Sequence, residues 1–186
     1  LGAEVGDFGR RLLRAAGGAP ALDLRGKLGG DRETSVAAVA LLMHAATSIN
    51  LSQNKLVAAE ATVLAAGLAA SGSLNVVDTR DNGIDGEAAK ELAAAALASS
   101  SMITFGEVPI KELRADARTT LDLSGKRLGL TEALVLAGLI AVSRSLNSID
   151  VGYNGIDQAA ALELLAAMKE KAMVSIGMAS CNLGVE

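Results

Sequence analysis

The side chains that most often carry out catalysis are scarce in this sequence. His44 is the single histidine and Cys181 the single cysteine among the 186 residues. The chain therefore offers neither a local nucleophile–base pair nor a histidine-rich zinc motif. The lysines of "RGKL" and "SGKR" lack the glycine four residues ahead and the following Ser or Thr of a phosphate-binding loop. We expect a non-enzymatic protein that has no cofactor and no metal site.

Carboxylates, by contrast, recur at one position of a repeated pattern. A polar residue stands between two hydrophobic ones in stretches such as "LDL", "INL" and "IDV". The residues at this position are Asp23, Asn50, Asp78, Thr104, Asp122, Asp150 and Gly177. The residues that flank it include Arg25, Ser52, Arg80, Asp81, Glu107 and Tyr153.

This polar position predicts a mainly acidic surface. Adjacent strands are about 4.8 Å apart, so Asp122 and Asp150 on neighbouring strands would repel each other by about 1 kcal/mol in water. Arg80 would then serve as an internal counter-charge, and Tyr153 as an aromatic anchor. One interpretation is a site for a partner protein with a basic surface, made of Asp23, Asn50, Asp78, Arg80, Asp81, Asp122, Asp150 and Tyr153. The alternative is that these are solvated polar residues that keep an exposed sheet soluble.

The elements that would position these side chains follow from the repeat itself. The first hydrophobic residues of the copies are Leu22, Ile49, Val77, Ile103, Leu121, Ile149 and Ile176. Their spacings of 27, 28, 26, 18, 28 and 27 residues indicate a solenoid in which each unit stacks on its neighbours. The alternating pattern predicts short strands near residues 20–25, 47–52, 75–80, 101–106, 119–124, 147–152 and 174–179. We expect residues 1–186 to form a single domain.

Between the strands the hydrophobic period changes from 2 to 3.6, which predicts helices over 58–71, 85–100, 130–144 and 157–172. One apolar column on these helices is expected to pack on a parallel sheet; it consists of Leu64, Leu92, Leu136 and Leu164. The 18 residues from Ile103 to Leu121 are too few for a full helix, so the stretch between them predicts at most a short helical turn. This short unit is either a notch that serves as a contact point or a short repeat without a ligand.

A further column lies five residues after the first hydrophobic one. It contains Lys27, Asn54, Asn82, Val108, Lys126, Asn154 and Cys181. With this column, "INLSQNKL", "LDLSGKRL", "IDVGYNGI" and "IGMASCNL" resemble the leucine-rich repeat pattern L-x-x-L-x-L-x-x-N/C-x-L. The resemblance implies that Cys181 is a structural ladder residue rather than a catalytic thiol. Val108, Lys27 and Lys126 depart from the pattern, and we expect their copies to be less regular.

Units of about 28 residues with full helices resemble the ribonuclease-inhibitor-like class of leucine-rich repeats. This resemblance implies an α/β horseshoe arc, with parallel strands on the concave face and helices on the convex face. The leading hypothesis for function is a protein-interaction scaffold, or an accessory subunit of a larger assembly, that binds through the concave strand face or the repeat ends. The alternative is a GTPase-activating protein similar to the Ran-specific members of this class, although no residue singles it out.

Composition limits the remaining classes of protein. Apolar residues make up 51% of the chain, but runs such as "ALVLAGLIAV" fall short of the roughly 18 residues that span a bilayer. A net charge of -4 and a pI near 5.1 give no basic footprint for nucleic acid. A single cysteine excludes an intrachain disulfide and favours an intracellular protein.

The two ends of the sequence predict a longer array. Leu1 stands 21 residues before Leu22, which is also the separation of Leu56 from Val77. Leu1 is thus expected to end a preceding repeat, and "IGMASCNLGVE" to stop where its helix would begin. We expect an ordered fragment, or an array whose ends another element covers. "LGAEVGDFGRRLLRAAG" is expected to form an amphipathic helix whose basic residues face water.

Overall fold

The computed structural model describes residues 21–28, 32–171 and 175–182, apart from the side chains of Arg32 and Thr34. The amphipathic helix expected at the amino end, the repeat end expected at Leu1 and the last ladder hydrophobe, Leu183, lie outside these residues. Within the described ranges, no helix is both long and apolar enough to cross a membrane.

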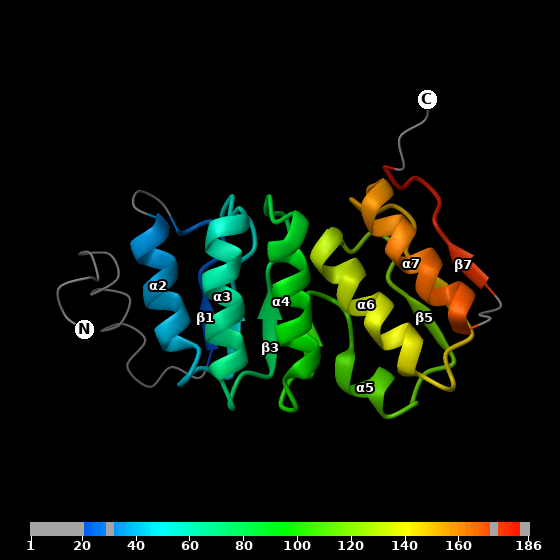
Figure 1. The fold of residues 1–186 in the computed structure, drawn as a ribbon, viewed down its shortest axis with the longest axis horizontal. Helices are drawn as coiled ribbons and strands as arrows, with labels where there is room; N and C mark the ends of the chain where they lie inside the picture. The colour runs from blue at the N-terminus through cyan, green and yellow to red at the C-terminus, as the bar shows by residue number, and fades with distance from the viewer. Residues whose placement is uncertain (1–20, 29–31, 172–174, 183–186) are drawn as a thin grey trace.

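Parallel strands alternate with helices along the described chain. The strands are β1 (Ala21–Asp23), β2 (Ser48–Asn50), β3 (Val76–Asp78), β4 (Thr104–Phe105), β5 (Thr120–Asp122), β6 (Ser148–Asp150) and β7 (Ser175–Gly177). The helices are α2 (Arg32–Leu42), α3 (Ala58–Ala70), α4 (Gly86–Ala98), α5 (Ile110–Arg114), α6 (Leu130–Val142) and α7 (Gln158–Lys171). Figure 1 shows the helices side by side in one layer that covers the strands. This alternation fits a leucine-rich repeat.

Aliphatic side chains from both layers fill the core between the helices and the strands. The helical column of Leu64, Leu92, Leu136 and Leu164 is fully buried, as are the strand residues Ile49 and Val77. Burial of each such side chain contributes roughly 2 kcal/mol. The core therefore continues from one unit to the next and contains few aromatic residues.

The strands form two sheets rather than one continuous line, with β1 to β4 in the first and β5 to β7 in the second. After β4 the chain turns back on itself: the N–H of Phe105 donates to the carbonyl of Val108 at 3.1 Å, and the reverse bond is 2.9 Å. The N–H of Lys111 also donates to the carbonyl of Ile103 at 3.2 Å. The chain thus covers the edge of β4 that would otherwise pair with β5.

In the fourth unit, the pairing of β4 with β3 is shifted by two residues from the predicted register. Val77 pairs with Phe105 and not with Ile103. Phe105 is fully buried, whereas Ile103 is 39% exposed. A shift of two residues keeps every side chain on the same face of a strand, so the hydrophobic alternation could not exclude it. Thr104 therefore leaves the predicted polar position, and Val108 belongs to the turn instead of the ladder.

The asparagines of the predicted ladder join successive units through the backbone. The side-chain N–H groups of Asn82 donate to the carbonyls of Thr79 and Leu51 at 2.7 and 3.0 Å, and its Oδ1 accepts from the N–H of Asn54 and of Leu56 at 2.9 and 3.0 Å. Asn54 and Asn154 donate to the corresponding carbonyls, and the Oδ1 of each accepts from one N–H, that of Leu28 or Leu128.

The other residues of the ladder column differ in their burial. The Sγ of Cys181 donates to the carbonyl of Val151 at 3.4 Å, which gives this cysteine the structural position that the pattern indicates. Lys27 and Lys126 are exposed. His44, the single histidine, is exposed in the turn that follows α2.

A second ladder, made of serines, joins the units at the opposite ends of the strands. The Oγ of Ser71 donates to the carbonyl of Met43 at 2.6 Å, and that of Ser101 to the carbonyl of Leu74 at 2.7 Å. The Oγ of Ser145 donates to the carbonyl of Arg118 at 2.7 Å. These residues belong to a Ser-x-Ser motif that follows α3, α4 and α6 at 71–73, 99–101 and 143–145.

Candidate functional site

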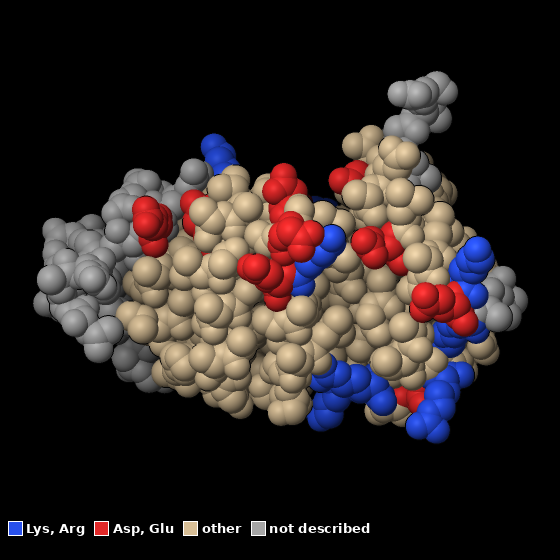
Figure 2. All heavy atoms as spheres, in the orientation of Figure 1, with Lys and Arg blue, Asp and Glu red and all other residues tan. Residues whose placement is uncertain are grey.

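Charged side chains divide between the two edges of the helix layer. Glu33, Glu60 and Glu87 lie in the first turns of their helices, where the helix dipole favours negative charge. Figure 2 shows most acidic side chains along this edge, with a few basic ones among them, and a group of basic side chains at the opposite edge, near α5. The strands end at the acidic edge, so the predicted site also lies there.

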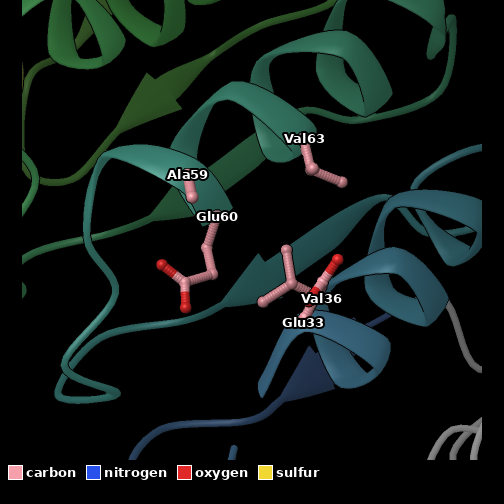
Figure 3. Close-up of a pocket in the computed structure, with 5 residues that line it drawn as sticks. All are labelled: Glu33, Val36, Ala59, Glu60 and Val63. Atoms are coloured by element: carbon pink, nitrogen blue, oxygen red, sulfur yellow. The ribbon is translucent and has the colours of Figure 1, made fainter. Parts of the chain in front are cut away.

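A small hollow opens between α2 and α3 (Figure 3). Its volume is about 160 Å³, and it is lined by Glu33, Val36, Ala59, Glu60 and Val63. The Oε2 of Glu60 accepts a hydrogen bond from the N–H of Val57 at 3.1 Å and so caps the start of α3. Helix capping accounts for this carboxylate, and we assign no binding site to the hollow.

The sheet face opposite the helices, here called the strand face, carries the predicted polar residues Asp23, Asn50, Asp78, Asp122 and Asp150. In each of them a side-chain oxygen accepts a hydrogen bond from the N–H two residues later, at 2.8 to 3.2 Å. These contacts are Asx turns, which end the strands. The polar side chains are therefore fixed in direction by the local backbone.

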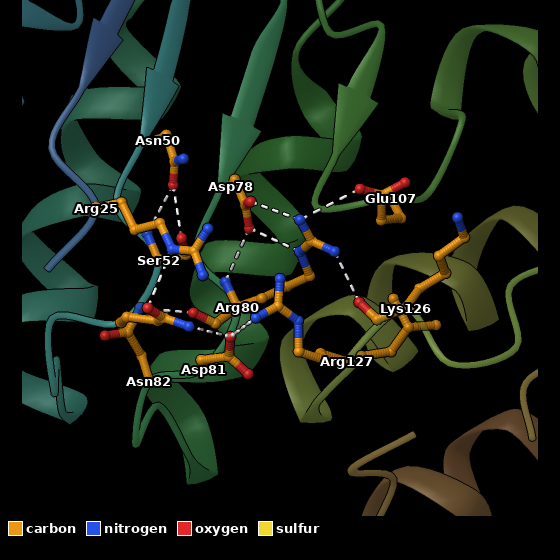
Figure 4. Close-up of polar contacts among 12 residues, drawn as sticks. Arg25, Asn50, Ser52, Asp78, Arg80, Asp81, Asn82, Glu107, Lys126 and Arg127 are labelled. Carbon is orange, nitrogen blue, oxygen red and sulfur yellow. Dashed lines mark hydrogen bonds and ion pairs between the residues drawn. The ribbon is translucent and has the colours of Figure 1, made fainter. Parts of the chain in front are cut away.

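Arg80 lies at the junction of the two sheets (Figure 4). Its Nη2 donates to the Oδ2 of Asp78 at 2.7 Å and lies 3.2 Å from the Oε1 of Glu107. Its Nη1 donates to the carbonyl of Lys126 at 2.7 Å. Lys126 follows β5, so this one guanidinium joins the first sheet to the second across the short fourth unit.

The Arg80–Asp78 pair is largely shielded from solvent, since the two side chains are 11% and 15% exposed. Burial alone would raise the pKa of Asp78, but the hydrogen bonds and the charge of Arg80 outweigh it and hold that pKa below its ordinary value. The hydrogen bond to Asp78 in turn raises the pKa of Arg80. Both groups are therefore charged at neutral pH, and Arg80 neutralises Asp78.

A chain of polar contacts crosses four units on the exposed side of this junction. The Nε of Arg25 donates to the Oε1 of Gln53 at 3.0 Å, and the Nε2 of Gln53 donates to the Oδ2 of Asp81 at 3.2 Å. The same oxygen of Asp81 lies 2.9 Å from the Nη1 of Arg127. Gln53 and Asp81 both have positive φ angles, 60° and 56°, which turn their side chains along the array.

Glu132 is buried under this junction, at the start of α6, and is 2% exposed. Its Oε1 accepts a hydrogen bond from the hydroxyl of Thr79 at 3.3 Å, and its Oε2 accepts one from the N–H of Gly129 at 3.1 Å. Burial raises the pKa of Glu132, although these hydrogen bonds oppose the shift. Gly106, with a φ of 59°, leaves room for this side chain, since a Cβ there would lie 2.8 Å from the Cγ of Glu132.

The raised pKa of Glu132 predicts a pH dependence of stability. As pH rises from the ordinary value near 4.5 through the raised value, the unfolded chain releases the proton first, so the free energy of unfolding falls. Glu132→Gln keeps the shape of the side chain but cannot ionise, so it is expected to remove this pH dependence. The free energy of unfolding of the variant, compared with that of the wild type, is therefore expected to be higher at pH 8 than at pH 4. Urea unfolding of both proteins at several pH values measures the difference. Glu163→Gln, at an exposed position, is the control, and an equal pH-dependent difference in it would contradict the assignment.

The remaining predicted residues lie apart from this junction. Asp122 and Asp150 are neighbours in the pairing of β5 and β6, as expected. Hydrogen bonds from the hydroxyl and N–H of Ser124 lower the pKa of Asp122, and the positive charge of Lys126 acts in the same direction. Tyr153 is 68% exposed, and its φ of 56° places it at the same turn position as Gln53 and Asp81.

Sequence reasoning missed three residues of the junction. Gln53, Arg127 and Glu132 were not among the predicted site residues, although each contacts its surroundings as described above. The sequence held one indirect signal for a buried partner, although it did not single out Glu132. Thr79 is the one polar residue in the predicted strand column of Leu24, Leu51, Thr79, Phe105, Leu123, Val151 and Met178, and a buried hydroxyl needs a hydrogen-bond partner.

The comparisons with known proteins show a fold and no family. No family model matches the sequence, and no curated protein matches it. Among solved structures, the chain is similar to one titled leiomodin-1 actin-binding site 2, with a TM-score of 0.51 and 12% sequence identity over 90% of each chain. The two chains therefore share an arrangement of strands and helices.

Proposed function

We propose that this protein is a non-enzymatic interaction module that binds a partner protein through the strand face. The observation that carries the proposal is the row of Asx turns, which holds charged side chains in fixed directions on an exposed surface. Side chains that are ordered before binding lose less conformational entropy when the complex forms. The structural neighbour is titled an actin-binding site, and the shared fold supports a protein-binding role here.

The charges of the strand face favour a partner with a basic surface. Asp23, Asp122 and Asp150 are exposed, and none of them has an ion-pair partner within the described residues. Their negative charges are thus free to meet lysines or arginines of a partner. Tyr153 adds an exposed aromatic ring next to this group. The proposal also includes a location inside the cell and a role as a scaffold or as an accessory subunit of a larger assembly. Its repeats are proposed to be of the ribonuclease-inhibitor-like class.

Replacing Asp23, Asp122 and Asp150 together by Asn is expected to weaken partner binding about tenfold, because each exposed charge contributes roughly 0.5 kcal/mol. Asn preserves the turn, as Asn50 shows at the same position. Crosslinking mass spectrometry through Lys27, Lys55 and Lys126 identifies partners in a native extract. Co-sedimentation with filamentous actin tests the partner that the neighbour's title suggests.

The control carries the same change of charge on the helix layer. Glu33, Glu163 and Glu170 are exposed on α2 and α7, and their joint replacement by Gln is expected to leave binding unchanged. If both triple variants lose affinity equally, the interaction depends on net charge and not on the strand face. Undiminished binding of the Asn variant, with crosslinks only at the terminal units, would place the interaction at the ends of the array.

A further inference from the structure

A second hollow, distinct from the strand face, opens at the edge where the strands begin. Its volume is about 500 Å³. The residues that line it include Asn75, Ser100, Met102, Ile103, Lys111 and Arg114. These residues come from the segment before β3, the segment that joins α4 to β4, and α5. The hollow therefore belongs to the short fourth unit.

The shortness of α5 creates this space. α5 has 5 residues, whereas α4 and α6 have 13 each. α4 consequently packs directly against α6, which Gly138 permits, since a Cβ there would lie 2.5 Å from the Cδ1 of Leu97. The hollow lies beside α5, next to the segment that follows the carboxyl end of α4.

Two basic side chains line the hollow without a neutralising carboxylate. The Nη1 of Arg114 donates to the carbonyl of Ser99 at 2.8 Å, and its Nη2 donates to the carbonyl of Leu97, so the guanidinium is held in place by neutral groups. Lys111 has no ion-pair partner among the described residues, and the neighbouring Glu112 is paired with Arg118. No acidic side chain is among the residues that line the hollow.

Neutral hydrogen-bond donors accompany this positive charge. Asn75 and Ser100 also line the hollow, and the side chain of neither forms a hydrogen bond within the described ranges. The flanking serines of the motif are used differently, since the Oγ of Ser101 donates to the carbonyl of Leu74. Ser100, Asn75 and Lys111 thus leave three donor groups available, beside the held guanidinium of Arg114.

We propose that this hollow binds a phosphoryl group carried on a carbon chain. A phosphate monoester has three acceptor oxygens and about two negative charges, which match several donors around two cations better than a single carboxylate does. Ile103, which is 39% exposed, and the buried Met102 provide an apolar wall for the carbon chain. This site is separate from the strand face, so its failure would leave the proposed function intact.

Nuclear magnetic resonance titration of the full 186-residue chain tests the proposal. The probes are a blocked pentapeptide with a central phosphoserine, the same peptide without phosphate, and inorganic phosphate. We expect saturable shifts of the backbone amides of residues 100–103 and 111–115 with the phosphopeptide and none with its unphosphorylated form. Tighter binding of the phosphopeptide than of inorganic phosphate would support a phosphoryl group on a carbon chain, and equal binding of the two would overturn the role of the apolar wall and leave a site for a free phosphate-sized ion.

Lys111→Gln is expected to weaken phosphopeptide binding about tenfold, because it removes one charge-assisted hydrogen bond. Lys111 lies on the exposed side of α5, so the variant is expected to fold as the wild type does. Lys169→Gln, at an exposed position of α7, is the matched control and is expected to bind normally. Absence of saturable shifts with both phosphate-bearing probes, or an equal loss in the two variants, would overturn the proposal.

Discussion

Asn82→Ala is expected to lower the free energy of unfolding by about 3 kcal/mol. The substitution removes the acceptor of two backbone N–H groups, those of Asn54 and Leu56, and the donor to the carbonyls of Leu51 and Thr79. These groups lie between stacked units, where water reaches them poorly, so the loss of partners leaves buried polar groups unpaired. Urea unfolding followed by circular dichroism measures the effect.

Lys126→Ala provides a matched control, because Lys126 occupies the same column in another unit and its side chain is exposed. We expect the free energy of unfolding to change by no more than about 0.5 kcal/mol, as for most surface substitutions. Its carbonyl group, which accepts from Arg80, is unaffected by the substitution. Comparable losses in the two variants would mean that the ladder asparagines contribute no more than any residue at this turn.

Arg80→Met is expected to destabilise the fold by roughly 2 to 3 kcal/mol. Methionine retains the aliphatic stem, but Asp78 loses its counter-charge in a half-buried position and the carbonyl of Lys126 loses a donor. Because Arg80 joins the two sheets, the loss also weakens the contact between the two halves of the array. Urea is the suitable denaturant, since guanidinium salts would screen the ion pair.

A double-mutant cycle with Asp78→Asn isolates the ion pair, because Asn retains the Asx turn while removing the charge. We expect Arg80→Met and Asp78→Asn together to lower the free energy of unfolding by less than the sum of their separate effects. The control is Arg127→Met, whose pair with Asp81 is more exposed and is expected to contribute less than about 1 kcal/mol. Additive effects of Arg80→Met and Asp78→Asn would show that Arg80 acts mainly through Lys126.

The sequence by itself determined the repeating unit of this protein and the faces of its elements. Hydrophobic alternation is a local property, so the strands lie within the predicted segments, and the helical leucines such as Leu92 are buried as expected. The ladder asparagines were predictable for the same reason, since Asn54, Asn82 and Asn154 each bond to groups in their own turn and in the preceding unit.

Only the tertiary structure decided the register of the fourth unit and the junction that results from it. A shift of two residues preserves the alternation, so the choice between Ile103 and Phe105 depended on how the chain turns back at Gly106 to cover the edge of β4. The contacts of Arg80 with Lys126 and of Thr79 with Glu132 join residues 46 and 53 positions apart. Such contacts depend on how the short unit brings its two neighbours together, which no local pattern of residues specifies.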